Sequence, residues 1–106
     1  MEQKEYLALT KELYDRVFGA FEDEDPDEIE ADYNLDSISI LFSNGKKFII
    51  NRQPPVQQIW LAAGLKGYHF NYESDKKQWT CDKTGGEFYQ VLSSGISEML
   101  KREIQI

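Results

Sequence analysis

Apolar residues in the middle of the chain recur at every second position, which is the spacing of a β-strand with one buried face. Ile29, Ala31 and Tyr33 follow this spacing, and residues 37–42 repeat it. Asn44-Gly45 comes directly afterwards and is the dipeptide most typical of a tight β-hairpin. We therefore expect antiparallel strands, the first of which has a wet, acidic face.

The rest of the middle region predicts further short strands, separated by residues that break or turn a strand. The strands are expected at residues 46–53, 57–62, 68–72 and 78–82. Pro54-Pro55 ends the first of them, and residues 64–67 and 74–77 supply turns.

The two ends of the chain have the spacing of amphipathic helices, with apolar residues three and four positions apart. The first helix is expected over residues 3–21, with an apolar stripe of Tyr6, Leu9, Leu13, Val17 and Phe21. The second is expected to open with Thr84 and Glu87 as a capping box. Its buried face would be Phe88, Leu92, Ile96 and Met99.

Two helices with one apolar stripe each cannot form a core by themselves. Packed together on one face of the sheet, they would bury both stripes and the inward strand positions. The prediction is an α+β fold, a two-layer sandwich of the order α-β5/6-α, in a single domain over residues 1–106. The other face of the sheet, which we call the open face, should be solvated.

Alternation along the strands predicts which side chains lie on the open face. It places Asn51 and Gln53 there from one strand, and Gln58 and Trp60 from the next. An exposed tryptophan among amides resembles a binding hot spot. The alternative is that Trp60 is buried under a loop or helix, as large aromatic residues usually are. Trp79 is assigned to the core or its rim.

Charge is distributed very unevenly along the chain, whose net charge is −7. Residues 1–36 carry 13 acids and 3 bases, and residues 37–106 carry 6 acids and 9 bases. An acidic half repels phosphate backbones, which argues against nucleic acid as a partner. Cations or basic protein surfaces are the natural partners. The alternative is a solvated acidic face that only keeps the protein soluble.

The single cysteine, Cys81, excludes an intramolecular disulfide and fits a reducing compartment. Residues 1–10 lack the features of a signal peptide, and apolar stretches such as residues 59–63 are too short to span a bilayer. We therefore expect a cytoplasmic protein without a membrane partner. His69 is the only histidine, and no motif supports Cys81 as a nucleophile, so no enzyme activity is predicted.

One spaced motif is specific enough to suggest a family. It comprises Asn51-Arg52-Gln53, Pro55, Gln58 and Trp60-Leu61-Ala62, followed by Gly67-Tyr68-His69-Phe70. This motif resembles the signature of the frataxin family in its bacterial, CyaY-type form, and the stretch from Trp79 to Phe88 is similar as well. The resemblance covers essentially the whole chain and implies the frataxin fold.

The resemblance also implies a function. Frataxins bind ferrous and ferric iron (Fe2+/Fe3+) weakly, with little selectivity over other hard cations. They regulate iron–sulfur cluster assembly by binding the cysteine desulfurase (IscS) and the cluster scaffold (IscU). Carried over by position, the metal-binding acidic ridge comprises Glu22, Asp23, Glu24, Asp25, Asp27, Glu28, Glu30 and Asp32. Partner binding is assigned to Asp15, Asn51, Gln53, Gln58 and Trp60.

Two functional alternatives remain at this point. One is a monomeric adaptor of the desulfurase–scaffold complex, and the other is an iron store or chaperone that delivers iron and oligomerises. One departure from the family weakens the helical end of the ridge. Bacterial relatives carry acids on the last exposed turn of the first helix, where this chain has Phe18 and Gly19, with Ala20 beyond. Glu12 and Asp15 would extend the ridge up the helix.

Overall fold

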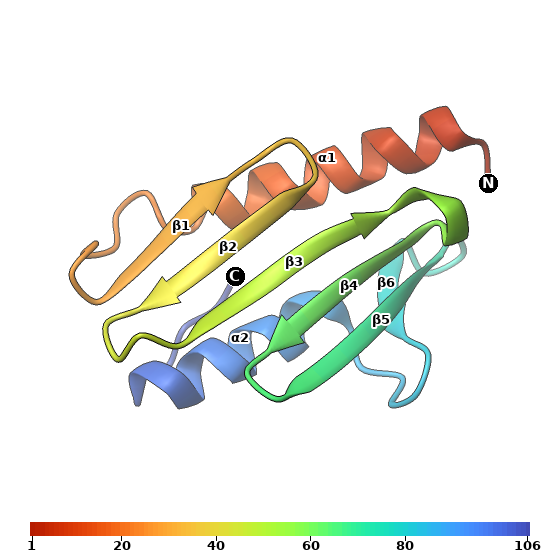
Figure 1. The fold of residues 1–106 in the computed structure, drawn as a ribbon. Coiled ribbons are helices and arrows are strands. Elements are labelled where there is room, and N and C mark those ends of the chain that lie inside the picture. Colours follow the sequence, from red (N-terminus) through yellow and green to blue (C-terminus); the bar gives the residue numbers. More distant parts are fainter.

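The computed structural model describes all 106 residues and contains two helices and six strands (Figure 1). The elements are, in order, α1 (Gln3–Gly19), β1 (Ile29–Tyr33), β2 (Ser37–Phe42), β3 (Lys47–Gln53), a short 3-10 helix η1 (Pro54–Val56), β4 (Gln58–Ala63), β5 (Lys66–Glu73), β6 (Gln78–Cys81) and α2 (Phe88–Leu100). Neither helix is long and apolar enough to cross a bilayer.

All six strands form one antiparallel sheet, in which each strand pairs with its neighbours in the sequence. The order β1-β2-β3-β4-β5-β6 leaves β1 at one edge and β6 at the other. The β2–β3 hairpin closes through Asn44-Gly45, as predicted, and Gly45 has a φ of +85° that a side chain would disfavour.

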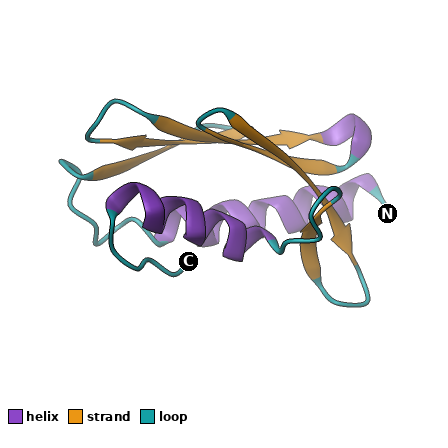
Figure 2. Cartoon of the chain, turned by 90° about the horizontal axis from the view of Figure 1, so that it is seen from below, coloured by secondary structure: helices purple, strands orange, loops and turns teal.

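Both helices lie on the same side of the sheet (Figure 2). Between them and the sheet lies one cluster of 19 buried residues, drawn from both helices, all six strands and Phe21 in the loop after α1. Every second residue of β2, β3 and β4 is buried, as the two-residue spacing predicts: Ile38, Ile40, Phe42, Phe48, Ile50, Ile59 and Leu61. The α+β two-layer sandwich predicted from the sequence is therefore confirmed.

The buried face of α1 differs in detail from the predicted stripe. Thr10 and Tyr14 are completely buried, whereas Leu9 lies at the margin of the core. Each buried polar side chain has a backbone partner. The hydroxyl of Thr10 donates to the carbonyl of Leu7 at 3.0 Å, and that of Tyr14 donates to the carbonyl of Asp36 at 2.6 Å. Polar side chains whose hydroxyl groups find such acceptors can be buried with little penalty. A prediction that counts only apolar residues therefore misses part of the buried face of α1.

The start of α2 was predicted wrongly. Glu87 is the N-cap, and its carboxylate accepts hydrogen bonds from the backbone amides of Tyr89 and Gln90 at 2.9 and 3.1 Å. Thr84 instead accepts from the amide of Gly86 within a turn. The chain is still paired with β6 at Glu87, through a bridge to Thr80, and therefore enters the helix only afterwards.

The turn between β4 and β5 is tighter than the sequence predicted. Only Gly64 and Leu65 lie outside the ladder, because Ala63 pairs with Lys66 and Ala62 pairs with Gly67. Gly64 has a φ of +66°, which suits a two-residue hairpin. Residues 66 and 67 therefore belong to β5.

Tyr6 ties α1 to the connection between β3 and β4. Its buried hydroxyl donates to the carbonyl of Gln58 at 2.6 Å and accepts from the amide of Gln53 at 3.0 Å. These two glutamines flank η1 and pair directly across the strands. One side chain from the helix thus fixes the ends of both strands that carry the predicted open-face residues.

We predict that Tyr6→Phe lowers the free energy of unfolding by about 1–3 kcal/mol, because the amide of Gln53 loses its acceptor in a partly buried place. Urea denaturation followed by circular dichroism measures this loss. Tyr72→Phe is the matched control, because Tyr72 also packs against the core but its hydroxyl makes no hydrogen bond within the chain. Equal losses in the two variants would contradict the role given to Tyr6.

Candidate metal and partner surfaces

The acidic ridge runs from the loop after α1 along the edge strand β1 (Figure 1). Phe21 and Ile29 are buried and anchor the loop at both ends. Between them Asp25 organises a turn, because its carbonyl accepts from the amides of Glu28 and Ile29, and its carboxylate accepts from the amide of Asp27 at 2.9 Å. Because Phe21 and Ile29 are anchored in the core, the acidic side chains of the loop between them lie on the outside.

Most carboxylates of the ridge face solvent. Six are exposed, namely Glu22, Asp23, Asp25, Asp27, Glu30 and Asp32, whereas Glu24 and Glu28 are half-buried. No three acidic, histidine or cysteine side chains gather closely enough anywhere in the chain to form a ready metal site. The ridge is therefore a region of negative potential with hard oxygen ligands, and it is not a preformed coordination sphere.

The two half-buried carboxylates share a counter-ion that the sequence analysis did not identify. Arg102, beyond the end of α2, donates from Nη2 to Glu24 at 2.7 Å and from Nε to Glu28 at 3.0 Å. These hydrogen bonds raise the pKa of Arg102 above its ordinary value. The pairing joins residues 74 and 78 positions apart, so no local pattern in the sequence signals it.

The two acids of α1 considered as extensions of the ridge lie in different places. Asp15 forms an ion pair with Lys11 at 2.6 Å and accepts from the hydroxyl of Tyr33 on β1, so it faces the ridge side but is already paired. The hydrogen bond from Lys11 lowers the pKa of Asp15. Glu12 instead lines a groove against the β5–β6 hairpin, together with Tyr72. It therefore does not extend the ridge.

Phe18 lies on the last turn of α1, at a position where bacterial members of the family were expected to carry an acid. Its ring packs edge-on against Tyr33, with 5.5 Å between the ring centroids. The last turn of α1 is consequently attached to β1 by aromatic contact and adds no carboxylate to the ridge. The acidic side chains are thus concentrated in the loop and on the edge strand.

On the open face, the predicted partner-binding side chains of β3 and β4 lie together. Asn51 pairs across the strands with Trp60, and Gln53 with Gln58. The indole Nε1 of Trp60 donates to Oε1 of Gln58 at 2.7 Å. Trp60 is half-buried, and it alternates along β4 with the buried Ile59 and Leu61, so its side chain lies on the face of the sheet opposite the core.

β5 completes this group with two residues that the sequence analysis left unassigned. The ring of His69 stacks on the indole of Trp60, with 4.2 Å between centroids and 10° between planes. Asn71 accepts from Nε2 of Gln58 at 3.1 Å. Both positions flank the buried Phe70, so strand alternation would have placed them outward once Phe70 was assigned to the core.

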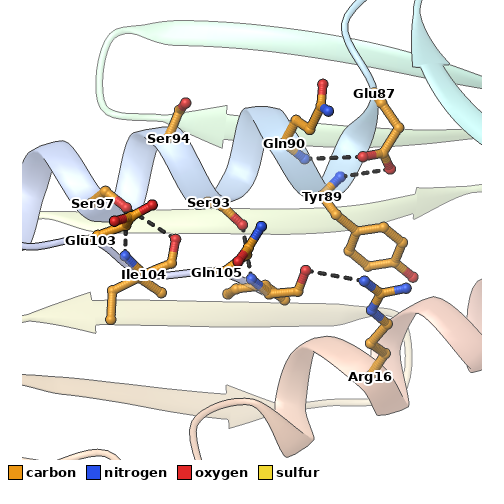
Figure 3. A pocket seen from close by; sticks show the side chains of 11 residues that line it. Arg16, Glu87, Tyr89, Gln90, Ser93, Ser94, Ser97, Glu103, Ile104 and Gln105 are labelled. Atoms are coloured by element: carbon orange, nitrogen blue, oxygen red, sulfur yellow. Dashed lines mark hydrogen bonds between the residues drawn. The ribbon is translucent and has the colours of Figure 1, made fainter.

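Cys81, the only cysteine, is buried in the core on β6. A groove between α1 and α2 is lined by the last residues of the chain (Figure 3). There Ser97 bonds both the amide and the carbonyl of Ile104, and Ser93 accepts from the amide of Ile106. Arg16 closes this groove, stacked over Tyr89 at 3.7 Å.

Two helices on one face of an antiparallel sheet, an acidic edge strand and an aromatic–amide open face define a small α+β domain with two chemically different surfaces. Its family is shown by comparison with known proteins. The chain belongs to the frataxin family, because the model of the frataxin-like domain matches residues 1–102. This family is linked to iron binding and iron–sulfur cluster assembly, and it is not a classical enzyme family.

Solved structures agree with this assignment. A CyaY-family frataxin from Psychromonas ingrahamii is 32% identical, with a TM-score of 0.88 over 99% of this chain and 97% of that one. A trimeric frataxin from the yeast Saccharomyces cerevisiae, complexed with ferrous iron, is 21% identical, with a TM-score of 0.65 over 96% and 88% of the two chains. A second trimeric yeast structure, with a full-length N-terminus, is 21% identical and has a TM-score of 0.64 over 96% and 81%. At this identity the yeast proteins show the shared fold alone.

The two tryptophans should differ sharply in their contribution to stability. Trp79 is 4% exposed in the core, so Trp79→Ala is expected to lower the free energy of unfolding by about 3–5 kcal/mol. Trp60→Ala removes one stacked pair and one hydrogen bond on the sheet surface and should cost about 1–2 kcal/mol. Thermal and urea melts of both variants test this difference. A loss for Trp60→Ala as large as that for Trp79→Ala would make Trp60 a core residue.

Proposed function

We propose that this protein is an iron-responsive adaptor of the iron–sulfur cluster machinery in the cytoplasm. In this proposal it binds the cysteine desulfurase through the acidic ridge and the cluster scaffold through the open face, as a monomer. The observation that carries the proposal is the presence of two separate surfaces of different chemistry on one sheet. Trp60 on β4 lies three strands from the edge strand β1, roughly 14 Å at ordinary strand spacing.

Iron acts as both cargo and signal for such an adaptor. The carboxylates of the ridge are hard oxygen ligands that suit Fe²⁺ and Fe³⁺ but also Ca²⁺, Mg²⁺ and Mn²⁺. Because no three of them converge, several cations would bind weakly along the ridge and without strong selectivity. Each bound cation would relieve repulsion between neighbouring acids and change the charge that a partner meets.

The acidic ridge suits a basic partner. Six exposed carboxylates on one loop and strand create a negative field that accelerates the approach of a positively charged surface and makes association sensitive to salt. The desulfurase is proposed as this partner. Iron bound to the ridge would weaken the attraction, which gives a direct physical link between iron level and desulfurase binding.

The open face suits a contact of another kind. Trp60 is held by its hydrogen bond to Gln58 and by the stacked ring of His69. A large side chain that is already ordered loses little entropy on binding, which favours a hot spot. Asn51 lies opposite Trp60 on β3, and Gln53 and Asn71 lie beside Gln58, so donors and acceptors are at hand for a polar rim. The scaffold is proposed as the partner at this surface.

An iron store or chaperone is the second candidate. It is supported by the trimeric yeast relative complexed with ferrous iron, although that relative shares only 21% of its sequence with this chain. A store requires many irons per chain and assembly into oligomers. Analytical ultracentrifugation over a range of Fe²⁺ under anaerobic conditions separates the two candidates, because the adaptor stays monomeric throughout.

The proposed function is tested by cluster assembly with the cognate desulfurase and scaffold, run with and without this protein at several iron concentrations. An adaptor should change the rate of cluster formation, and the change should depend on iron concentration. A rate that is unaffected at all iron levels, together with no binding to either enzyme, would overturn the proposal.

Charge reversal on the ridge should weaken desulfurase binding. Lysine at Glu22, Asp23 and Asp27 is expected to reduce affinity about tenfold or more at low salt, and the difference should shrink as salt screens the field. Asp25 is left unchanged because its carboxylate holds the turn.

The matched control for this variant carries lysine at Asp75, Asp82 and Glu98. These acids lie outside the ridge on the surface, and the change in net charge is the same. Surface plasmon resonance at several salt concentrations measures both variants. Equal losses would show that total charge, and not the ridge, governs binding.

Added metal should affect the NMR signals of the acidic ridge before those of any other part of the chain. During anaerobic addition of Fe²⁺, amide NMR signals of residues 22–32 are expected to broaden before all others. The reason is that hard carboxylate ligands are concentrated in this segment, so the bound iron should lie close to its amides. Signals of β5 and β6 should change last. Broadening centred on His69 or Cys81 would place the metal elsewhere and refute binding at the ridge.

A further inference from the structure

Arg102 supplies a positive charge of the chain itself to part of the acidic ridge. It is paired with Glu24 and Glu28, and the other six carboxylates of the ridge form no ion pair within the chain. All three paired side chains remain partly exposed, so solvent and ions can reach the pair. The guanidinium is thus an internal cation held at two of the eight acids.

The backbone around Arg102 explains why it lies there. α2 ends at Leu100, and Lys101 then takes a left-handed conformation with a φ of +58°, which turns the chain out of the helix. Two residues after Arg102 the chain is anchored again, because both backbone polar groups of Ile104 bond to Ser97 (Figure 3). The turn at Lys101 and the anchored Ile104 thus set the course of the backbone at Arg102, whose side chain reaches the ridge.

A metal ion bound by both Glu24 and Glu28 would lie beside the guanidinium, which already bridges these two carboxylates. Oε1 of Glu24 and Oε1 of Glu28 both accept from Arg102. A guanidinium and a metal ion cannot share these atoms at close range, because both carry positive charge. Binding of one must therefore weaken binding of the other, and the coupling is reciprocal.

We propose that Arg102 is an internal competitor for the Glu24–Glu28 pair, which hard cations enter only by displacing it. This inference rests on the proposed binding of iron to the ridge. It divides the ridge into two parts: the six exposed acids take up cations at low concentration, whereas Glu24 and Glu28 respond at higher concentration. When they respond, Arg102 is released, and the turn after α2 changes together with the ridge.

The test compares Arg102→Gln with Lys101→Gln. The two variants remove one positive charge each from adjacent positions, but Lys101 forms no ion pair within the chain. Ca²⁺ is the probe, as a hard cation without redox chemistry. Side-chain carboxyl signals of Glu24, Glu28, Asp23 and Asp27 are followed by carbon-detected NMR, and the Nε signal of Arg102 is followed in parallel.

In the unmodified protein, the signals of Glu24 and Glu28 should shift at higher Ca²⁺ than those of Asp23 and Asp27, and together with the Nε signal of Arg102. In Arg102→Gln, the Ca²⁺ midpoint of the two glutamates should fall by about two- to fivefold, which is the range expected when each glutamate loses one exposed ion pair. Lys101→Gln should leave that order of titration unchanged. Arg102→Lys keeps the charge but not the planar fork, and should fall in between.

The outcomes separate the inference from the function on which it rests. If Glu24 and Glu28 titrate alike in Arg102→Gln and Lys101→Gln, or saturate while the Nε signal of Arg102 stays fixed, the competition is refuted and metal binding at the ridge stands. If no carboxyl signal of residues 22–32 responds to Ca²⁺ or Fe²⁺ in any variant, both are refuted. Circular dichroism of each variant establishes that the fold is intact.

Discussion

Two helices are all that is available to cover a sheet of six strands, and both pack on the same face. This constraint determines most of the molecule. The inward positions of every strand join the helices in one core, and every outward position must be compatible with water. The open face can therefore present amides, His69 and the half-buried Trp60 without any loop to cover them. Tyr6 then fixes α1 at the point where β3 and β4 meet.

The edge strand β1 is subject to a second constraint. An exposed sheet edge invites pairing with another chain, and charged side chains are one means of preventing it. Glu30 and Asp32 on β1 continue the negative charge of the preceding loop, so the same acids protect the edge and form the proposed contact surface. Within the ridge only Glu24 and Glu28 are paired with a positive charge, that of Arg102. The acidic side chains and the aromatic–amide group are consequently kept apart, at the edge of the sheet and in its middle.

Much of the fold could be predicted because alternation and helical periodicity are local. The hairpin at Asn44-Gly45 and the inward residues of β2 to β4 follow from spacing alone. The errors arose where a local signal allows two outcomes. Thr84 and Glu87 can each cap a helix, and the bridge between Thr80 and Glu87 decided between them. Similarly, the burial of Tyr14 depended on whether a distant carbonyl, that of Asp36, could accept from its hydroxyl.

The sequence by itself determined that residues 22–32 are strongly acidic, and that Asn51 and Gln53, like Gln58 and Trp60, share one face of their strand. These properties depend on composition and on the two-residue repeat of a strand, which any antiparallel sheet of this chain would preserve. Only the tertiary structure decided that His69 stacks on Trp60, that Glu12 and Asp15 lie apart, and that Arg102 reaches Glu24 and Glu28. Such contacts join residues far apart in the chain, and they depend on strand register and on how the end of α2 meets the loop after α1, which no local pattern encodes.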